Sequence, residues 1–164
     1  QIKQEWANIQ TNIINSTSLR KVTLTLFGEP MPKQSVRSFI AKDKIMHYQP
    51  KEMTSRLKDY QAQIKNQLPK DFIRFETRVH ITKMHFIFAP LKAFQKIKGR
   101  MEAIHAGEII YKETRPDLPD NLKKLVNDSM SELVFKDDSI IVSEDNVKKY
   151  YGTGGCIIIE MTGY

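Results

Sequence analysis

The sequence predicts one α+β domain, a small mixed or antiparallel sheet packed with helices. Segments with the two-residue period of strands and segments with the 3.6-residue period of helices follow each other in mixed order, and adjacent strands disfavour a doubly wound parallel sheet. The chain has 164 residues, of which 40% are hydrophobic. This composition suffices for one core that needs no disulfide or metal to hold it together.

The first half of the chain combines strand patterns with one helix. Residues 22–26 alternate between apolar and threonine side chains, as in a strand with one buried face. Residues 36–40 and 45–48 flank four residues rich in charge, which predicts a hairpin with a four-residue loop. A helix is expected over residues 50–68, because proline is favoured at a helix start and a second proline follows.

The second half continues the mixed order. Residues 79–88 are apolar and rich in β-branched side chains, typical of a long strand. A helix with a basic face is expected over residues 94–105. Apolar residues on one helical face predict a further helix over residues 121–134, with Asp120 as its N-cap. Three short strands are then expected, over residues 140–142, 147–151 and 157–161.

Residues 1–20 are expected to form an amphipathic arm ahead of a domain that comprises residues 21–164. Four apolar residues recur at helical spacing, namely Ile2, Trp6, Ile9 and Ile13. The arm is therefore expected to pack on the body or on a partner chain. The sequence begins at Gln1 rather than Met, as in a processed product or a fragment, and no apolar signal segment is seen.

Charge is distributed unevenly along the chain, which carries a net +7. Residues 1–100 contain 19 basic and 7 acidic side chains, whereas residues 101–164 contain 7 and 12. A basic protein is expected to bind nucleic acid first and an anionic membrane surface second. No stretch approaches the roughly 18 apolar residues of a membrane-spanning helix. The single cysteine, Cys156, excludes an intramolecular disulfide and is typical of a reducing compartment.

Aspartates lie at both ends of the last predicted helix. Asp117 and Asp120 come at its start, and Asp137 and Asp138 follow it where the chain turns into a strand. If that strand runs back along the helix, three carboxylates converge on an oxygen site of the kind that Mg²⁺ or Mn²⁺ prefers. In a basic protein, such a site suggests metal-assisted phosphodiester hydrolysis. Lys124 shares a helix face with Asp120 and is expected to contact the scissile phosphate.

Each of these residues also has a plainer interpretation. Asp120 alone is a common helix cap, and Asp137 with Asp138 is a common turn. Lys124 with Asp128 is typical of a surface ion pair within a helix. The four histidines lack the spacing of metal ligands and are interpreted as core or surface residues.

The same residues resemble the central motif of the RusA family of Holliday-junction resolvases, which is similar to K/R-P-D-x-D-N-L-x-K followed by a K-D-D-x-x-V strand. Residues 115–124 and 136–141 match it, with Asp128 as a further helical aspartate. A second family feature, G-x-P-x-P-K-Q with a following arginine, is matched by residues 28–34 and Arg37. The family has one residue between its first two aspartates, whereas this chain has two, Leu118 and Pro119, which are expected to form a kink.

The resemblance implies a RusA-like fold and an Mg²⁺-dependent endodeoxyribonuclease, with Mn²⁺ as a substitute, that acts as a homodimer on four-way DNA junctions in recombination and repair. It carries the catalytic aspartates over to Asp117, Asp120 and Asp138, with Asp137 beside them as a further metal ligand. The essential lysine of the family is carried over to Lys124.

Positive side chains near the two motifs are expected to contact DNA phosphates. They are Lys33, Arg37, Arg115, Lys123, Lys148 and Lys149. The expected location is the cytoplasm, either of a bacterium or of the host of a phage or prophage, without membrane contact. Two other functions stay open: a non-catalytic protein that binds junctions or duplex DNA on the same scaffold, which the Leu118-Pro119 insertion favours, and a basic protein–protein adaptor.

Overall fold

The computed structural model describes residues 19–164 except Ser35. For Asp120 it describes the backbone but not the side chain. The arm that the sequence predicts over residues 1–20, with Trp6, lies almost entirely outside the described residues. The division into arm and domain therefore stays a prediction.

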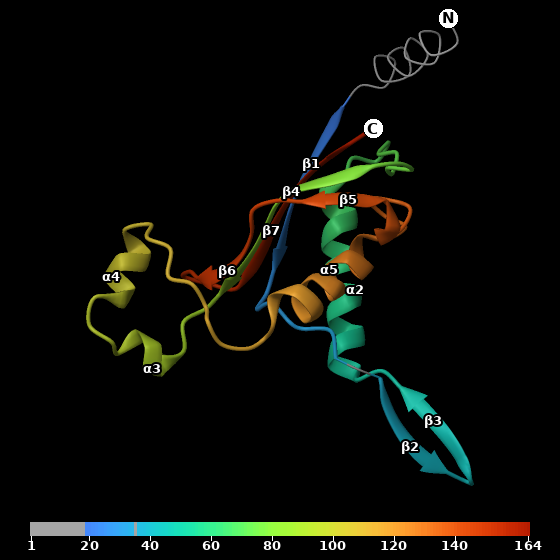
Figure 1. Cartoon of the computed structure of the whole chain (residues 1–164), viewed down its shortest axis with the longest axis horizontal. Coiled ribbons are helices and arrows are strands. Elements are labelled where there is room, and N and C mark those ends of the chain that lie inside the picture. Colours follow the sequence, from blue (N-terminus) through green and yellow to red (C-terminus); the bar gives the residue numbers. More distant parts are fainter. Residues whose placement is uncertain (1–18, 35) are drawn as a thin grey trace, which may run out of the picture.

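A five-stranded mixed sheet forms the centre of the molecule (Figure 1). Its strands are β1 (Arg20–Phe27), β4 (Val79–Phe88), β5 (Ile141–Glu144), β6 (Val147–Tyr151) and β7 (Cys156–Gly163). Strand β7 lies between β1 and β4 and is antiparallel to both, whereas β5 and β6 pair with successive parts of β4 in parallel. The predicted α+β class is confirmed, and the parallel pairs make the sheet mixed.

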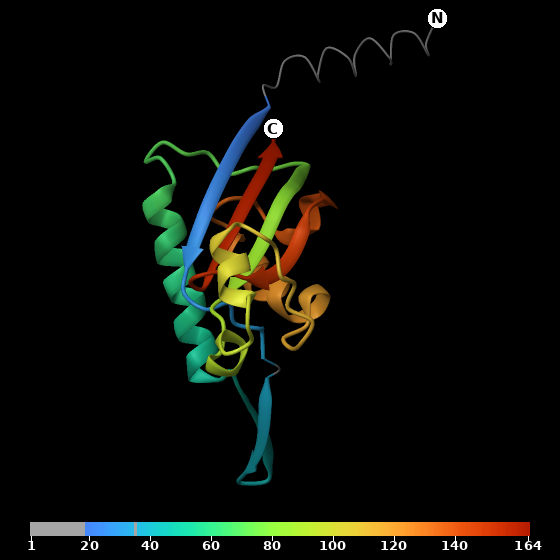
Figure 2. The same cartoon turned by 90° about the vertical axis from the view of Figure 1, so that its left-hand side faces the viewer.

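The hydrophobic core fills the space between this sheet and the helices α2 (Lys51–Gln67) and α5 (Lys123–Met130). Alternate residues of β1 are buried, as the period of two predicts, and the same alternation holds for β7. The short helices α3 (Lys92–Gln95) and α4 (Arg100–His105) lie on the other side of the sheet (Figure 2). Within the described residues, no helix is both long and apolar enough to cross a membrane.

The predicted helix over residues 94–105 is wrong, because α3 and α4 are separate short helices. Gly99 has a φ of 82°, in the left-handed region that glycine adopts readily, and it stands immediately before α4. The predicted hairpin is confirmed as β2 (Arg37–Ala41) and β3 (Lys44–Tyr48), but its four-residue loop is wrong. Lys42 and Asp43 alone form the turn, with φ of 49° and 59°, which suits the twist of a two-residue hairpin loop.

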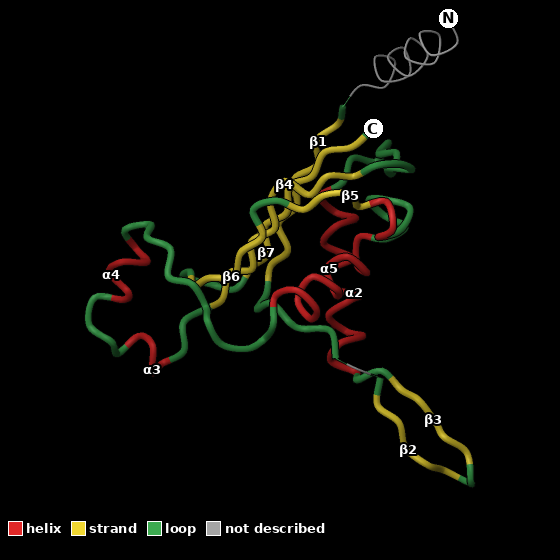
Figure 3. Tube along the Cα trace, viewed as in Figure 1, coloured by secondary structure: helices red, strands yellow, loops and turns green. Residues whose placement is uncertain are grey.

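The hairpin projects from the body as a separate two-stranded sheet (Figures 1 and 3). Its large apolar side chains are exposed, Ile40 and Ile45 most of all, at 78% and 66%. The hairpin also carries Arg37, Lys42 and Lys44. This element therefore presents both charge and apolar surface away from the core.

The helix predicted over residues 121–134 is shorter at both ends. Residues 118–122 form a π-helical turn, η1 (Leu118–Leu122), in which the Leu122 N–H donates to the Asp117 carbonyl at 3.2 Å. Asp117 rather than Asp120 therefore occupies the N-cap position. At the other end, Glu132 has a φ of 68° and donates its N–H to the Phe135 carbonyl at 2.8 Å, so the chain turns directly after α5.

Two glutamines of α2 cover part of the open edge of β1. The Gln67 side chain accepts from the Thr25 N–H at 2.9 Å and donates to the Thr25 carbonyl at 2.7 Å. Gln63 makes the same pair of bonds with Phe27, at 2.7 and 3.0 Å. Because the two side chains are four residues apart, they lie on one helix face and mimic a neighbouring strand.

Gly28 ends β1 and begins the proline-rich segment of residues 28–34. Its φ is 116°, and a Cβ added there would overlap the guanidinium of Arg56. Its N–H donates to the Gly155 carbonyl at 3.2 Å. The glycine of the motif is thus required by its backbone conformation, whereas the end of the Arg56 side chain can move aside.

We predict that Gly28→Ala lowers the free energy of unfolding by about 1–3 kcal/mol, because alanine must adopt a strained φ beside Arg56. Urea unfolding followed by circular dichroism measures this change. Gly154→Ala is the matched control, since nothing lies within 4 Å of a Cβ there and its φ is not positive. Equal stability of the two variants would contradict the prediction.

Candidate functional site

The two sequence motifs meet at the start of α5. The Lys33 N–H donates to the Asn121 carbonyl at 2.9 Å, and the Lys33 ammonium contacts the Asp128 carboxylate at 2.6 Å. Both side chains are about one-third exposed, at 30% and 32%. The proline-rich segment is thereby attached to η1 and α5, and the predicted pairing of Lys124 with Asp128 is replaced by a contact from the other motif.

The first two aspartates of the motif lie at the turn η1, one before it and one inside it. Asp117 is exposed and directly precedes the turn, while the Asp120 backbone lies inside it. A π-turn arises when an α-helix takes up one extra residue, and such turns are frequent at functional sites. The chain has one residue more than the family motif between these aspartates, and Leu118 and Pro119 form the beginning of the π-turn. The insertion is therefore accommodated by the helix rather than by a bulge outside it.

The adjacent aspartates Asp137 and Asp138 have different environments. The Asp137 carboxylate accepts a hydrogen bond from the Ser139 N–H at 2.8 Å and caps the short 3₁₀ helix η2 (Asp138–Ile140). Hydrogen bonds from the Ser139 hydroxyl and then its N–H hold the pKa of Asp137 below its usual value. Asp138 is exposed and is free to meet a ligand.

Asp138 lines a hollow between α5 and β5, with a volume of about 350 Å³. Its lining residues are Asn127, Asp138, Ile141, Val142, Ser143 and Glu144. The strand after Asp138 thus lies beside the helix, as the sequence argument requires. The hollow contains two residues that the sequence argument missed, Asn127 and Glu144, although Glu144 belongs to the strand that was expected to run along the helix.

The chemistry of this hollow suits a hard divalent cation. Asp138, Glu144 and Asn127 bring carboxylate and amide oxygens, the donors that Mg²⁺ and Mn²⁺ prefer. The Asn127 Oδ1 atom is buried and has no hydrogen-bond partner. Among the residues whose side chains are described, no three Asp, Glu, His or Cys side chains lie close enough together to hold a metal. The side chain of Asp120 is outside that set, so its predicted role stays a prediction.

The lysines of the site differ in what they contact. Lys123 is paired with Glu144, and both side chains are about three-quarters buried. Lys124 is exposed and has no hydrogen bond or ion pair to any described side chain. Lys149 donates to the carbonyls of Thr114 and Pro116, at 2.8 and 2.9 Å.

Three of the six predicted DNA-contacting residues therefore have internal partners, namely Lys33, Lys123 and Lys149. Arg37 and Arg115 are exposed, and Lys148 is half-buried on β6. The exposed arginines are thus the members of this set whose charge is most accessible to a polyanion.

Three of the four histidines bond to neighbouring polar groups, as expected of core or surface residues. His85 is buried between the Tyr150 hydroxyl and the Asn146 amide oxygen, at 2.9 and 3.1 Å. His80 and His47 contact Ser143 and Ser38 in the same way.

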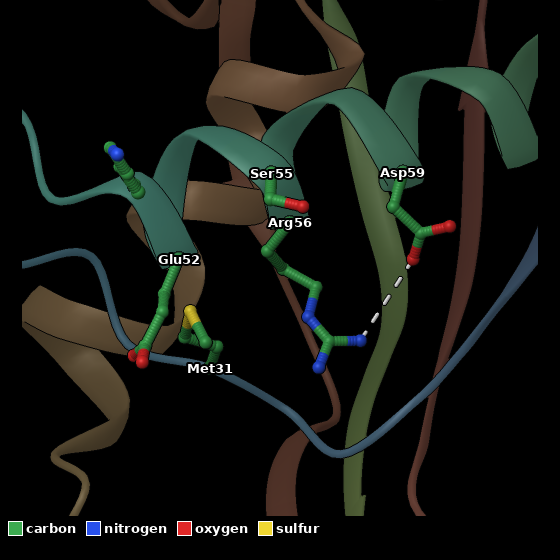
Figure 4. A pocket seen from close by; sticks show the side chains of 6 residues that line it. Met31, Glu52, Ser55, Arg56 and Asp59 are labelled. Atoms are coloured by element: carbon green, nitrogen blue, oxygen red, sulfur yellow. Dashed lines mark ion pairs between the residues drawn. The ribbon is translucent and has the colours of Figure 1, made fainter.

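A second, larger hollow of about 600 Å³ lies between α2 and the proline-rich segment (Figure 4). Its lining residues are Met31, Lys51, Glu52, Ser55, Arg56 and Asp59. Arg56 points toward Asp59, with 3.9 Å between the charged groups. Because both signs of charge line this hollow and none of the motif aspartates does, it is not the candidate site.

Comparison with known proteins identifies the family of the chain. The model of the endodeoxyribonuclease RusA family matches residues 28–162, which include both motifs and the four strands from β4 onward except the last residue of β7. The chain belongs to the RusA endodeoxyribonuclease family. It is 27% identical over 132 residues to the uncharacterized protein YqaN of Bacillus subtilis (strain 168), a match that covers 79% of this chain and 87% of that protein.

We predict that Lys149→Met lowers the free energy of unfolding by about 1–2 kcal/mol, because the Thr114 and Pro116 carbonyls lose a charged donor. Urea unfolding measures the loss. The neighbouring Lys148→Met is the control, since Lys148 makes no hydrogen bond or ion pair to the described residues and its replacement is expected to change stability by less than about 0.5 kcal/mol. A Lys149→Met variant as stable as the control would contradict a bracing role.

Proposed function

We propose that this protein is a metal-dependent endodeoxyribonuclease that resolves four-way (Holliday) junctions by hydrolysing phosphodiester bonds during DNA recombination and repair. Family membership supports DNA cleavage in general. The observation that carries the proposal for this chain is the attachment of the proline-rich segment to η1 and α5 through Lys33. It joins the two family motifs at the helix that also contributes Asn127 to the hollow of Asp138.

Asp117, Asp120 and Asp138 are proposed to hold Mg²⁺, or Mn²⁺ in its place. A bound divalent cation supplies Lewis-acid stabilisation of the phosphate and lowers the pKa of the attacking water. Asp138 is the best supported of the three, because its exposed carboxylate lines the hollow while Asp137 is engaged with Ser139. The exposed ammonium of Lys124 is proposed to stabilise the negative charge that develops on the phosphate.

The proposed substrate is branched DNA, and the proposed working form is a homodimer. A two-fold axis places two equivalent sites on two opposed strands of a junction. Arg37 on the projecting hairpin and Arg115 before η1 are proposed as phosphate contacts because both are exposed. The proposed location is the cytoplasm of a bacterium or of the host of a phage.

We predict that Asp138→Asn and Asp120→Asn each reduce nicking of a labelled four-way junction by at least about 100-fold, because a cation ligand is lost. Junction binding, measured by gel shift in Ca²⁺, is expected to persist. Asp71→Asn, in an exposed turn after α2 and outside both motifs and the hollow, is the control and should nick at the normal rate. Full cleavage by both site variants in Mg²⁺ would exclude the assignment.

Junction affinity is predicted to fall steeply with salt, because phosphate contacts release counterions from the DNA. Arg37→Ala should reduce the slope of log affinity against log salt concentration by about 1, whereas Lys70→Ala should leave it unchanged. Fluorescence anisotropy over a salt series measures both slopes. A slope near zero for the unmodified protein would instead favour the protein–protein adaptor.

A non-catalytic junction-binding protein is the second candidate function. The extra residue in η1 and the lack of a three-carboxylate cluster among the described side chains favour it. Comparison of nicking in Mg²⁺ and in EDTA separates the two, since only the nuclease produces metal-dependent product.

A further inference from the structure

Glu144 is a carboxylate of the candidate site that the family motif does not contain. It is the last residue of β5 and is held in register against Ile81 of β4, so its backbone position is fixed by the sheet. It lines the same hollow as Asp138. Its side chain is 25% exposed and is ion-paired with Lys123, the first residue of α5.

Asn127 provides an independent observation at the same place. It lies four residues after Lys123 and therefore on the same face of α5, which here faces β5. It lines the hollow with Asp138 and Glu144, and its Oδ1 atom is buried without a hydrogen-bond partner. An orphaned amide oxygen is destabilising unless something binds it, because its desolvation is not compensated.

We propose that Glu144 and Asn127 complete the cation site with Asp138, and that Lys123 is an internal counter-ion that the bound cation displaces from Glu144. The inference rests on the proposed function, because it assumes that Asp138 binds the cation. In the cation-free protein, the ammonium of Lys123 offsets the repulsion between two carboxylates around one hollow. A divalent cation carries more charge than the ammonium and takes more oxygen ligands, so Glu144 exchanges one partner for the other.

The exchange has a consequence for DNA binding. Once Glu144 binds the cation, the charge of Lys123 is no longer neutralised within the protein. Lys123 then becomes available to a phosphate oxygen at the edge of the site. Lys123 can therefore be ion-paired in the cation-free protein and still contact DNA once the cation is bound.

Mn²⁺ binding to the full chain without DNA tests the role of Glu144 and has a readout that does not depend on activity. Titration followed by electron paramagnetic resonance is expected to show binding weakened about tenfold or more in Glu144→Gln. Glu160→Gln is the matched control, because Glu160 is 27% exposed and ion-paired with Lys21 and Lys83 but lies outside the hollow. It should bind Mn²⁺ within about twofold of the unmodified protein.

Lys123→Met tests the counter-ion. Removing the competitor is expected to tighten Mn²⁺ binding about threefold to fivefold, the effect of a partly exposed ion pair. Lys83→Met is its control and should leave binding unchanged. The double variant Glu144→Gln with Lys123→Met should bind no more tightly than Glu144→Gln alone. Weaker or unchanged binding by Lys123→Met would overturn the counter-ion role.

Asn127→Ala distinguishes the loss of a cation ligand from misfolding as the cause of weaker Mn²⁺ binding. Because it removes an orphaned acceptor, it is expected to weaken Mn²⁺ binding while the midpoint of thermal unfolding stays the same or rises. If the unmodified protein binds Mn²⁺, loses it in Asp138→Asn and keeps it in both Glu144→Gln and Asn127→Ala, this inference fails while the proposed function stands. Absence of Mn²⁺ binding in the unmodified protein would overturn both.

Discussion

The hydrogen bond from the Lys33 N–H to the Asn121 carbonyl, with the ion pair from Lys33 to Asp128, joins segments that are 95 residues apart at the charged contact. Each bond contributes only about 1 kcal/mol or less, because both side chains are partly exposed. They are effective because the partners are already fixed: the motif segment by Gly28 at the end of β1, and α5 by the core under the sheet. Proper positioning of the candidate site therefore depends on the packing of the whole domain.

Adjacent residues of the same type have separate functions at this site. Asp137 closes a 3₁₀ turn, whereas Asp138 faces the hollow. Lys123 is paired inside the protein, whereas Lys124 is exposed. In each pair, the first residue has a partner within the cation-free protein, whereas the second is exposed. This division of roles lets a short segment combine a defined backbone with accessible charge.

The sequence predicted the strand over residues 79–88, because periodicity is a local property. Motif spacing is local too and singled out the aspartates, whose role as metal ligands stays a prediction. The length of α5 could not be predicted, since it is set by a positive φ at Glu132 and by a bond to Phe135 across the turn. The contacts of Glu144 and Lys149 could not be predicted, for a different reason. Their partners depend on β5 and β6 pairing in parallel with β4, which no single segment specifies.

The amides of Gln63 and Gln67 have a consequence for how this protein can associate. An exposed strand edge is a template on which further strands of other molecules can add. At Thr25 and Phe27 that template is already filled, so an incoming strand must displace two helix side chains before it can bond to the main chain of these residues. Helix α2 thus protects this end of the edge strand from the addition of a strand of another molecule.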